Sequence, residues 1–306
     1  MSALPVPARL DRAGVAATVG AFVVWGLFPL YWRLLERVPS LQIIAHRIVW
    51  SALLVAGWLA ATQGLRWWKA LAVQPRVLPT LALTSVLIAF NWGLYIWAVN
   101  AGHVVEASLG YFINPLVNVL LGVLVLKERL RPLQWLAVAC AALGVAWLAW
   151  QAGRAPWIAL GLAASFGLYG LFRKLVAVDA VAGLGAESVF LFLPALAFLG
   201  WCEAGHGGGF LRAASAGGWG WGADLLLVLG GAVTALPLIG FAYGVRRIPL
   251  SLVGLFQYVA PTLQFLIGVL VFREPFDAAH ATGFAAIWAG LALFAGEGAW
   301  RARHRG

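Results

Sequence analysis

Two apolar stretches of this chain, each long enough to cross a membrane, carry polar residues and a proline near their centres. The first is EASLGYFINPLVNVLLGVLVLKE at positions 106–128, and the second is PLSLVGLFQYVAPTLQFLIGVLVFRE at positions 249–274. A shift of 146 positions matches Pro115 with Pro261, Asn118 with Gln264, and Gly122 with Gly268. Amides are costly to bury in an apolar segment unless they have hydrogen-bond partners. Their occurrence at matching positions of two such segments therefore indicates a membrane protein with an internal repeat.

The composition places the whole chain in a membrane. It is 63% hydrophobic and 10% charged, whereas a soluble domain has about 25% charged residues. Apolar runs of about 20 residues, enough to cross about 30 Å of hydrocarbon, recur throughout. In hydrocarbon the backbone must satisfy its own hydrogen bonds, which requires helices, and the strand-like alternation of a barrel is absent. We therefore expect an all-α integral membrane protein with ten transmembrane helices, at 14–35, 41–62, 77–99, 104–126, 132–150, 155–174, 184–202, 224–245, 250–272 and 278–297.

The basic residues predict the orientation of these spans. A net charge of +10 would suggest nucleic-acid binding in a soluble chain, but here most Lys and Arg residues occupy short loops, as the positive-inside rule describes. With the N-terminus in the cytoplasm, fifteen of them fall on the cytoplasmic side and five on the outer side, with Arg47 left inside a span. We expect a multi-pass protein of the cytoplasmic (inner) membrane with both termini cytoplasmic and no nucleic-acid partner.

The internal repeat extends over both halves of the chain. The run GLFPLYWR at 26–33 is similar to GLYGLFRK at 167–174, at a shift of 141 positions, so span 1 matches span 6 and span 4 matches span 9. Five spans per half force the second half to enter the membrane from the opposite side, an inverted repeat typical of secondary transporters. The expected divisions are a cytoplasmic segment 1–13, a first repeat 14–150, a second repeat 151–297 and a basic tail 298–306.

The first half contains four distinctive runs, WGLFPLYW at 25–32, AHRIVWS at 45–51, NWGLYIWAVN at 91–100 and SLGYFINPL at 108–116, and the second half adds QYVAP at 257–261 and FRE at 272–274. These runs resemble the RarD branch of the EamA family, in the drug/metabolite transporter superfamily. The resemblance implies two EamA repeats that move metabolites, amino acids or drugs across the cytoplasmic membrane. Gln42 departs from the pattern, since the resemblance implies a glutamate one turn before the His46-Arg47 pair.

The polar residues of spans 4 and 9 lie on matching helical stripes. Tyr111, Pro115 and Asn118 are spaced i, i+4 and i+7, and Gln257, Pro261 and Gln264 repeat that spacing. One interpretation is that these residues do no more than hold neighbouring helices together through hydrogen bonds and close packing. We expect instead that the tyrosine and the amides contact a substrate near the midplane, and that the two prolines, which each remove a backbone donor, line the cavity or form a hinge.

Span 3 offers a second set of candidate substrate contacts. Asn91 and Tyr95 lie one turn apart, with Trp92 beside them, and amides with aromatic rings suit an amphipathic organic solute. The alternative is an aromatic belt at the membrane surface. That belt accounts better for the residues that flank spans, namely Trp67, Trp68, Trp219 and Trp221.

Arg47 and His46 begin span 2 near its outer boundary. Arg47 either reaches the outer headgroups or pairs with Glu36, or it faces the cavity and binds an anionic or zwitterionic substrate. His46 is either a hydrogen-bonded structural residue or a proton carrier, because the unperturbed pKa of histidine is close to neutral. We treat Arg47 as a candidate substrate contact and His46 as a candidate coupling residue near the outer mouth.

Two acids are expected at the starts of spans. Glu106 begins span 4, and Glu187 is the counterpart of His46 at the shift of 141 positions and begins span 7. An acid in the first turn of a helix is favoured by the helix dipole, which explains both. Glu187 is also a candidate protonatable gate.

The absence of other motifs excludes several classes of function. The sequence holds no G-x-x-x-x-G-K-[ST], H-E-x-x-H or G-x-S-x-G motif and no cluster of Cys and His, so we expect no enzyme activity, no cofactor and no metal site. The favoured function is a secondary transporter, an exporter or permease, of small organic solutes. An integral membrane enzyme and a passive lipid scramblase are the alternatives. The partners are then a small solute and the lipid bilayer; a monomer suffices, and a dimer stays open.

Overall fold

The computed structural model describes residues 11–64, 77–126, 132–153, 155–176, 178, 180–245, 247–248 and 256–304, and all regular secondary structure in these ranges is helical. The side chains of Pro115, Asn118 and Gly122 lie outside the described part. The helices are α1 Arg12–Gly26, α2 Phe28–Arg33, α3 Ser40–Gln63, α5 Val77–Asn100, α6 Val104–Leu126, α7 Pro132–Ala152, α8 Trp157–Leu175, α9 Ala180–Glu203, the 3-10 turn η1 Ala214–Ala216, α10 Trp221–Val245, α12 Val259–Leu266, the π-helical turn η2 Ile267–Val271 and α13 Ala278–His304.

The first expected span is divided into two helices. α1 ends at Gly26 and α2 begins at Phe28. Pro29 has no amide hydrogen to donate to the carbonyl of Trp25, four residues earlier, so the α-helical hydrogen bond there cannot form. The break is therefore caused by a proline within the run at 26–33, which is also the run that matches the second half of the chain.

The ninth expected span, 250–272, is also irregular. α12 begins only at Val259, and its helix changes to a π-helical turn at Ile267. Gln257 lies in the turn before α12, so it is not on the same continuous helix as Gln264. Pro261 falls in the first turn of α12, where a missing N–H breaks no hydrogen bond of the helix. Pro261 therefore leaves no carbonyl of α12 without its partner, and its role in the cavity or in a hinge stays a prediction.

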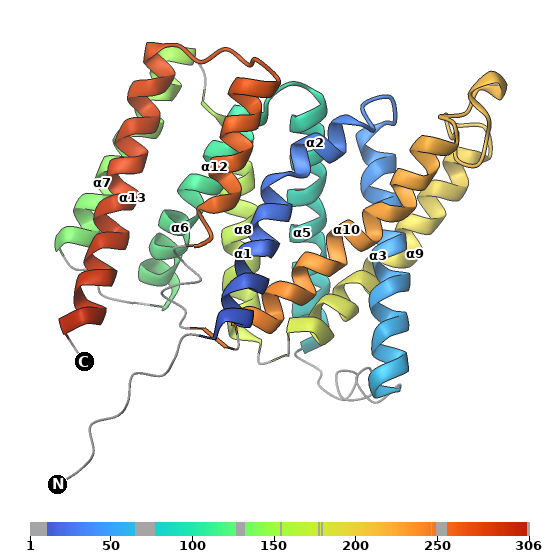
Figure 1. Ribbon diagram of the computed structural model, residues 1–306, viewed down its shortest axis with the longest axis horizontal. Coiled ribbons are helices and arrows are strands. Elements are labelled where there is room, and N and C mark those ends of the chain that lie inside the picture. The colour runs from blue at the N-terminus through green and yellow to red at the C-terminus, as the bar shows by residue number, and fades with distance from the viewer. Residues whose placement is uncertain are drawn as a thin grey trace, which may run out of the picture.

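The helices pack in pairs across the molecule (Figure 1). α7 lies against α13 at one edge, and α3 lies against α9 near the other. Between these edges α1 contacts α10 and α12, and α8 contacts α5 and α6. The start of α1 and the end of α13 lie at the same end of the bundle. The opposite end, here named the termini-distal end, carries the connections 34–39, 101–103, 155–156, 204–220 and 272–277.

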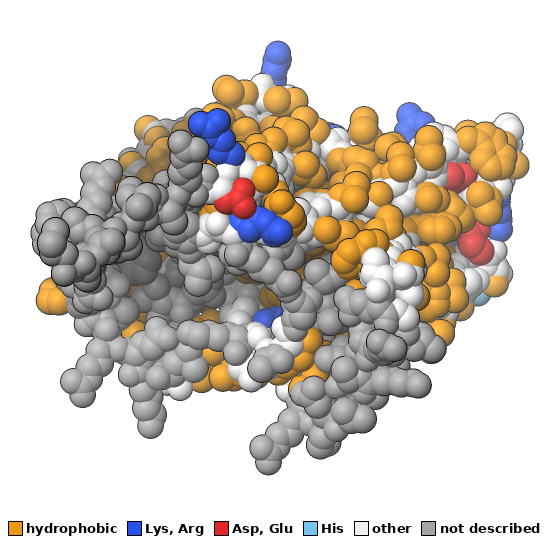
Figure 2. All heavy atoms as spheres, turned by 60° about the horizontal axis from the view of Figure 1, so that its bottom comes forward, with side chains coloured by type: hydrophobic (Ala, Val, Ile, Leu, Met, Phe, Trp, Pro, Cys, Tyr) orange, Lys and Arg blue, Asp and Glu red, His pale blue; other side chains and the backbone are white. Residues whose placement is uncertain are grey.

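Large apolar side chains cover much of the outer surface, as Figure 2 shows for one face. Trp150 of α7 is 82% exposed and Leu124 of α6 is 75% exposed. Such an apolar surface is stable in lipid and unstable in water. Among the described residues, six helical segments are long and apolar enough to cross a membrane: Arg12–Arg33, Ser40–Thr62, Val77–Asn100, Pro132–Gln151, Gly185–Glu203 and Trp221–Phe241. Together with the shorter apolar helices, these segments make a multi-pass membrane protein.

Candidate functional site in the bundle core

Arg47 lies in the interior of the bundle, and 3% of its surface is exposed. It sits on α3, which packs against α10, and its Nε donates a 2.8 Å hydrogen bond to Thr234 Oγ1 of α10. Beside it, Gly231 allows close approach of the two helices, because a Cβ there would come within 2.6 Å of the Trp50 backbone. The contact therefore fixes the guanidinium at a junction between distant parts of the chain.

Aromatic rings surround this guanidinium. Its central carbon lies 4.0 Å from the ring centre of Trp92, 5.3 Å from that of Trp32 and 5.6 Å from that of Phe28. Arg47 does not pair with Glu36, which binds Arg33 at 3.0 Å on the surface. The side chain of Arg47 is buried among aromatic residues, so two alternatives were wrong: that it pairs with Glu36 and that it reaches the outer headgroups.

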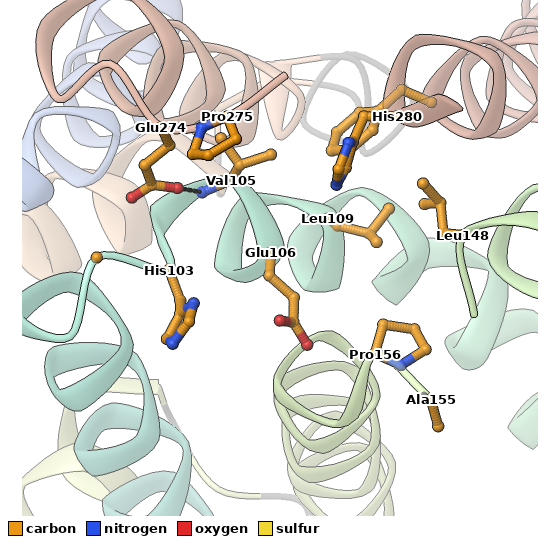
Figure 3. Close-up of a pocket in the computed structure, with 12 residues that line it drawn as sticks. His103, Val105, Glu106, Leu109, Leu148, Ala155, Pro156, Glu274, Pro275 and His280 are labelled. Carbon is orange, nitrogen blue, oxygen red and sulfur yellow. Dashed lines mark hydrogen bonds between the residues drawn. The ribbon is translucent and has the colours of Figure 1, made fainter. Parts of the chain in front are cut away.

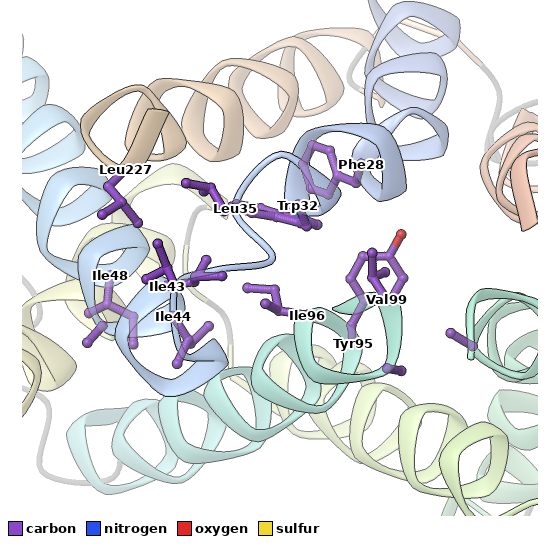
Figure 4. Packing of buried hydrophobic residues seen from close by; sticks show 14 of the residues in the cluster. Phe28, Trp32, Leu35, Ile43, Ile44, Ile48, Tyr95, Ile96, Val99 and Leu227 are labelled. Carbon is purple, nitrogen blue, oxygen red and sulfur yellow. The ribbon is translucent and has the colours of Figure 1, made fainter. Parts of the chain in front are cut away.

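Tyr95 lies in the same cluster of buried residues as Phe28 and Trp32. Figure 4 shows Tyr95 on α5 across from these two side chains of α2. Its ring packs edge-on against Tyr111 of α6, with centres 5.6 Å apart. The Tyr95 hydroxyl is buried and has no hydrogen-bond partner among the described residues. Tyr95, Trp92 and Arg47, three candidates from two spans, are thus brought together.

The side-chain amide of Asn91 forms its hydrogen bonds with other residues of the protein. Its Nδ2 donates to the Leu162 carbonyl and to Ser165 Oγ of α8, both at 2.9 Å. Its Oδ1 accepts from the Tyr111 hydroxyl at 3.4 Å. The side chain is 1% exposed. Asn91 therefore joins α5, α6 and α8 below the aromatic cluster, and its amide has little capacity left for a substrate.

His46 and Arg47 do not share a site. His46 faces the connection between α9 and α10, where its ring lies 4.5 Å from Phe210 and 6.4 Å from Trp219. Gln42, one turn earlier on α3, donates from Nε2 to the Gly207 carbonyl at 3.0 Å. This connection covers His46, which is 3% exposed, so the expectation that His46 lies at an open outer mouth was wrong. Trp219 is partly buried, and its place in an aromatic belt stays a prediction. Neither ring nitrogen of His46 has a hydrogen-bond partner among the described residues, so the hydrogen-bonded structural role was wrong.

Glu187 forms a second buried polar cluster. It is 1% exposed and lies two turns inside α9, so the assignment to a helix start was wrong. Its Oε1 accepts from Thr84 Oγ1 at 2.7 Å and lies 3.7 Å from Arg173 Nε, and its Oε2 accepts from the Tyr169 hydroxyl at 3.2 Å. Gly183 makes room for Arg173, because any Cβ there would clash with the guanidinium.

Gln264 braces the broken first span. Its Nε2 donates to the carbonyl of Trp25 at 3.1 Å, the same carbonyl that Pro29 leaves without its helical partner. Gln264 Oε1 is buried without a hydrogen-bond partner among the described residues. Gln257 is half-buried in the turn before α12. The side chains of Asn118 and Pro115, the counterparts of Gln264 and Pro261, lie outside the described part.

A separate cavity of about 360 Å³ opens at the termini-distal end. None of the sequence-predicted site residues lines it. Its acids serve as helix caps: both carboxylate oxygens of Glu274 accept from the amides of Val104 and Val105 at 2.7 Å, and Glu106 Oε1 accepts from the amide of Ile158 at 3.1 Å (Figure 3). Glu106 lies in the first turn of α6, as expected, and it also caps α8.

Several residues that complete these clusters were not identified from the sequence. Trp32, Thr234, Arg173 and Thr84 each look ordinary in their own span, and their partners lie far away in the chain. Arg173 lies two residues before the end of α8 at Leu175, where an arginine needs no partner inside the membrane, so its pairing could not be recognised from the sequence. Among the described residues, no group of three or more His, Cys, Asp or Glu side chains could hold a metal ion.

Comparison with known proteins places the chain in a family. Residues 12–150 match the model of the EamA-like transporter family. An uncharacterized transporter of Pseudomonas aeruginosa is 47% identical over 96% of this chain and 96% of its own, and Protein RarD of Salmonella typhimurium is 42% identical over 94% and 96%. A crystal structure that covers 93% of this chain and 96% of its own superposes with a TM-score of 0.56 at 20% identity, which shows similarity of fold alone. Three curated relatives named RarD are 41%, 42% and 46% identical over more than nine tenths of the chain, so this protein belongs to the RarD group of the EamA-like transporter family.

Proposed function

We propose that this membrane transporter is a secondary transporter that moves small organic solutes across the cytoplasmic membrane by alternating access. In the proposal the ten spans form two inverted repeats, 14–150 and 151–297, flanked by the cytoplasmic segments 1–13 and 298–306. The halves rock against each other around a central site, and both termini face the cytoplasm. One chain is sufficient for this mechanism.

The helix contacts support the inverted repeat. Exchange of the two halves pairs the α1 segment with α8, α3 with α9, α5 with α10, α6 with α12 and α7 with α13. Under this exchange the contact of α1 with α10 becomes that of α8 with α5, and the contact of α6 with α8 becomes that of α12 with α1; all four occur. The contacts of α3 with α9 and of α7 with α13 map onto themselves. Such symmetry is expected of inverted repeats around a pseudo-two-fold axis.

The observation that carries the function is the buried cluster around Arg47. Ionisable side chains inside a membrane bundle are expensive and usually mark the substrate or ion pathway. Here the guanidinium, Trp92 and Tyr95 come from the first half, and Thr234 comes from the second half. We assign substrate contact to these residues and to Tyr111. Asn91 and Gln264, whose amides donate hydrogen bonds to the protein, are assigned as positioning residues. Gln257 and Asn118 stay candidate contacts.

Coupling is assigned to the second polar cluster. Glu187 meets Arg173 and Tyr169 from α8 and Thr84 from α5. A carboxylate held by these groups can gain or lose a proton when the helices around it move, which would link a proton to transport. His46 and the two prolines, Pro115 and Pro261, are further candidates for coupling or gating.

The test is solute flux in proteoliposomes and in inside-out and right-side-out membrane vesicles. The protein is expected to move members of a panel of amino acids and aromatic metabolites faster than protein-free vesicles, with the two orientations reporting direction. Glu187→Gln keeps the size of the side chain and one of its two hydrogen-bond acceptors but removes the titratable carboxyl group, so flux should lose its dependence on a pH gradient. Glu36→Gln at the surface is the matched control. Protein-dependent movement of labelled phospholipid without solute flux would contradict the proposal and favour a scramblase.

A further inference from the structure

We infer that the Arg47 guanidinium binds a carboxylate of the transported solute, so that this transporter selects organic anions or zwitterions. The inference rests on the transporter function proposed above and adds a substrate class to it. It starts from a charge that the described part of the protein leaves without a counterion.

Arg47 takes part in no ion pair within the described residues. Four other arginines there do have carboxylate partners, namely Arg33, Arg173, Arg212 and Arg247. Among the described residues, the only hydrogen bond of Arg47 goes to the neutral hydroxyl of Thr234, and its Nη1 is buried without an acceptor. Removal of a cation from water costs several kcal/mol unless a partner offsets it. The rings of Trp92, Trp32 and Phe28 offset only part of this cost.

Buried Arg47 and partly exposed Arg173 differ in a way that identifies what is missing at Arg47. Arg173 lies 3.7 Å from the carboxylate of Glu187, so the protein supplies the anion in that cluster. At Arg47 the corresponding position is filled by aromatic rings and a hydroxyl. A carboxylate is therefore the group that would complete the Arg47 site in the way that Glu187 completes the other.

Of the three unsatisfied groups in the cluster around Arg47, two can only donate a hydrogen bond and the third, a hydroxyl, can donate or accept. They are Arg47 Nη1, the indole Nε1 of Trp32, whose ring lies 5.3 Å from the guanidinium, and the hydroxyl of Tyr95 in the same buried cluster. An arginine and an indole can only donate, whereas a carboxylate offers about four acceptor sites. A cationic ligand would add a second positive charge and would satisfy neither Arg47 nor Trp32. The surplus of donors thus favours an anionic group over a cation or an alkane.

The rings that line the site indicate the rest of the ligand. Trp92 covers one side of the guanidinium, and Tyr95 packs against Tyr111. Flat aromatic faces bind planar apolar groups, so the fitting solute has a carboxylate next to an aromatic or other apolar body.

The experiment uses matched pairs of solutes that differ in charge but hardly in size. N-acetylphenylalanine and its primary amide form one pair, and indole-3-acetate and indole-3-acetamide form another. Binding is measured by thermal shift of the purified protein at pH 7.5, and flux is measured in proteoliposomes against protein-free vesicles. The wild type should bind and move the carboxylate at least about tenfold better than the amide, because a charged hydrogen bond is worth about 1.5–3 kcal/mol.

Three variants distinguish the role of Arg47. Arg47→Gln should abolish the preference for carboxylates. Arg47→Lys keeps the positive charge but loses the bidentate geometry of the guanidinium, so it should retain part of the preference for carboxylates. Trp32→Phe removes one hydrogen-bond donor and should also weaken that preference. It replaces Arg47→Gln in the test if Arg47→Gln does not fold. Arg212→Gln, at the surface pair with Glu203, is the control and should behave as the wild type. An unchanged carboxylate-to-amide ratio in Arg47→Lys and Trp32→Phe would overturn the inference.

The outcomes also separate this inference from the proposed function. Equal movement of both members of each pair by the wild type would overturn the anion inference and leave the transporter function standing. If neither these pairs nor the neutral and cationic solutes of the wider panel move faster than in protein-free vesicles, the transporter function itself fails, and the inference fails with it.

Discussion

At the scale of single residues, the core of the bundle separates side chains that are satisfied by the protein from those that are not. Asn91 spends its amide on α8 and on Tyr111, whereas Arg47 and Tyr95 retain buried donors without acceptors. Hydrogen-bonded amides stabilise the bundle, and unsatisfied donors cost free energy unless a ligand meets them. Positioning and binding roles can therefore be assigned to neighbouring residues of the same helix.

Asn91→Leu should destabilise the protein without a change in solute preference. The substitution keeps the approximate volume but removes the donor to Leu162 and Ser165, and it leaves the Tyr111 hydroxyl without its acceptor. We expect a loss of about 1–3 kcal/mol in the free energy of unfolding, measured as denaturant or thermal unfolding in detergent. Ser165→Ala is the matched variant, and a double-mutant cycle should show coupling between the two positions. A cycle without coupling, or a change in the carboxylate-to-amide ratio, would contradict the positioning role.

At the scale of elements, polar side chains complete helices that belong to other parts of the chain. Gln264 of α12 donates to the carbonyl exposed by the break between α1 and α2. Glu274, in the connection that follows η2, caps α6, and Glu106 of α6 caps α8. Helix ends and breaks leave backbone groups unsatisfied, so the satisfaction of these groups from distant helices ties the elements into one bundle.

The role of Gln264 can be tested by restoring the missing backbone donor. Gln264→Leu leaves the Trp25 carbonyl unsatisfied and should cost about 1–3 kcal/mol of stability. Pro29→Ala supplies an amide hydrogen that can donate to this carbonyl. The double variant Pro29→Ala with Gln264→Leu should therefore recover much of the stability lost by Gln264→Leu alone, as measured by thermal unfolding in detergent. Pro5→Ala, ahead of α1, is a control for the loss of a proline. Additive effects in the double variant would exclude the proposed brace.

At the scale of the whole molecule, a bundle with symmetric helix contacts suits two halves that move as bodies. Contacts between α3 and α9 and between α7 and α13 cross the boundary between the halves at both edges. A rocking motion about these contacts would open one end of the bundle while it closes the other. In the proposed mechanism, such a motion would expose the central cluster around Arg47 alternately to the two sides.

Alternating access predicts opposite distance changes at the two ends. In a background where Cys140 and Cys202, both free, are replaced by serine, spin labels are placed at Ala101 and Ser215 at the termini-distal end, or at Thr62 and Leu175 at the other end. The distances between the labels, measured by double electron–electron resonance, should lengthen for one pair and shorten for the other when a transported solute or a pH gradient shifts the population of the two conformations. Two labels within one half, Leu34 and Ala101, should keep their separation. Parallel changes at both ends would contradict the rocking mechanism.

The sequence by itself determined the class of the molecule and most of its helices. Apolar length, sparse charge and backbone hydrogen bonding depend on local composition, and so the expected spans agree with the helices that the structure describes to within a few residues, apart from the first, the ninth and the end of the tenth, where α13 continues to His304. The duplicated motifs and the run at 25–32 were sufficient to identify the RarD group, but they did not predict the break at Pro29, because the first span was expected to be one helix.

Only the tertiary structure decided which polar side chains meet. Arg47 and Thr234 are 187 positions apart, and Gln264 and Trp25 are 239 positions apart. Helical spacing places a residue on a face of its own helix, but the rotation and tilt of that helix depend on packing against every neighbour. For this reason the sequence grouped His46 with Arg47, paired Arg47 with Glu36 and put Glu187 at a helix start. The packed bundle instead separates the first pair, buries Arg47 among aromatic rings and gives Glu187 its own arginine.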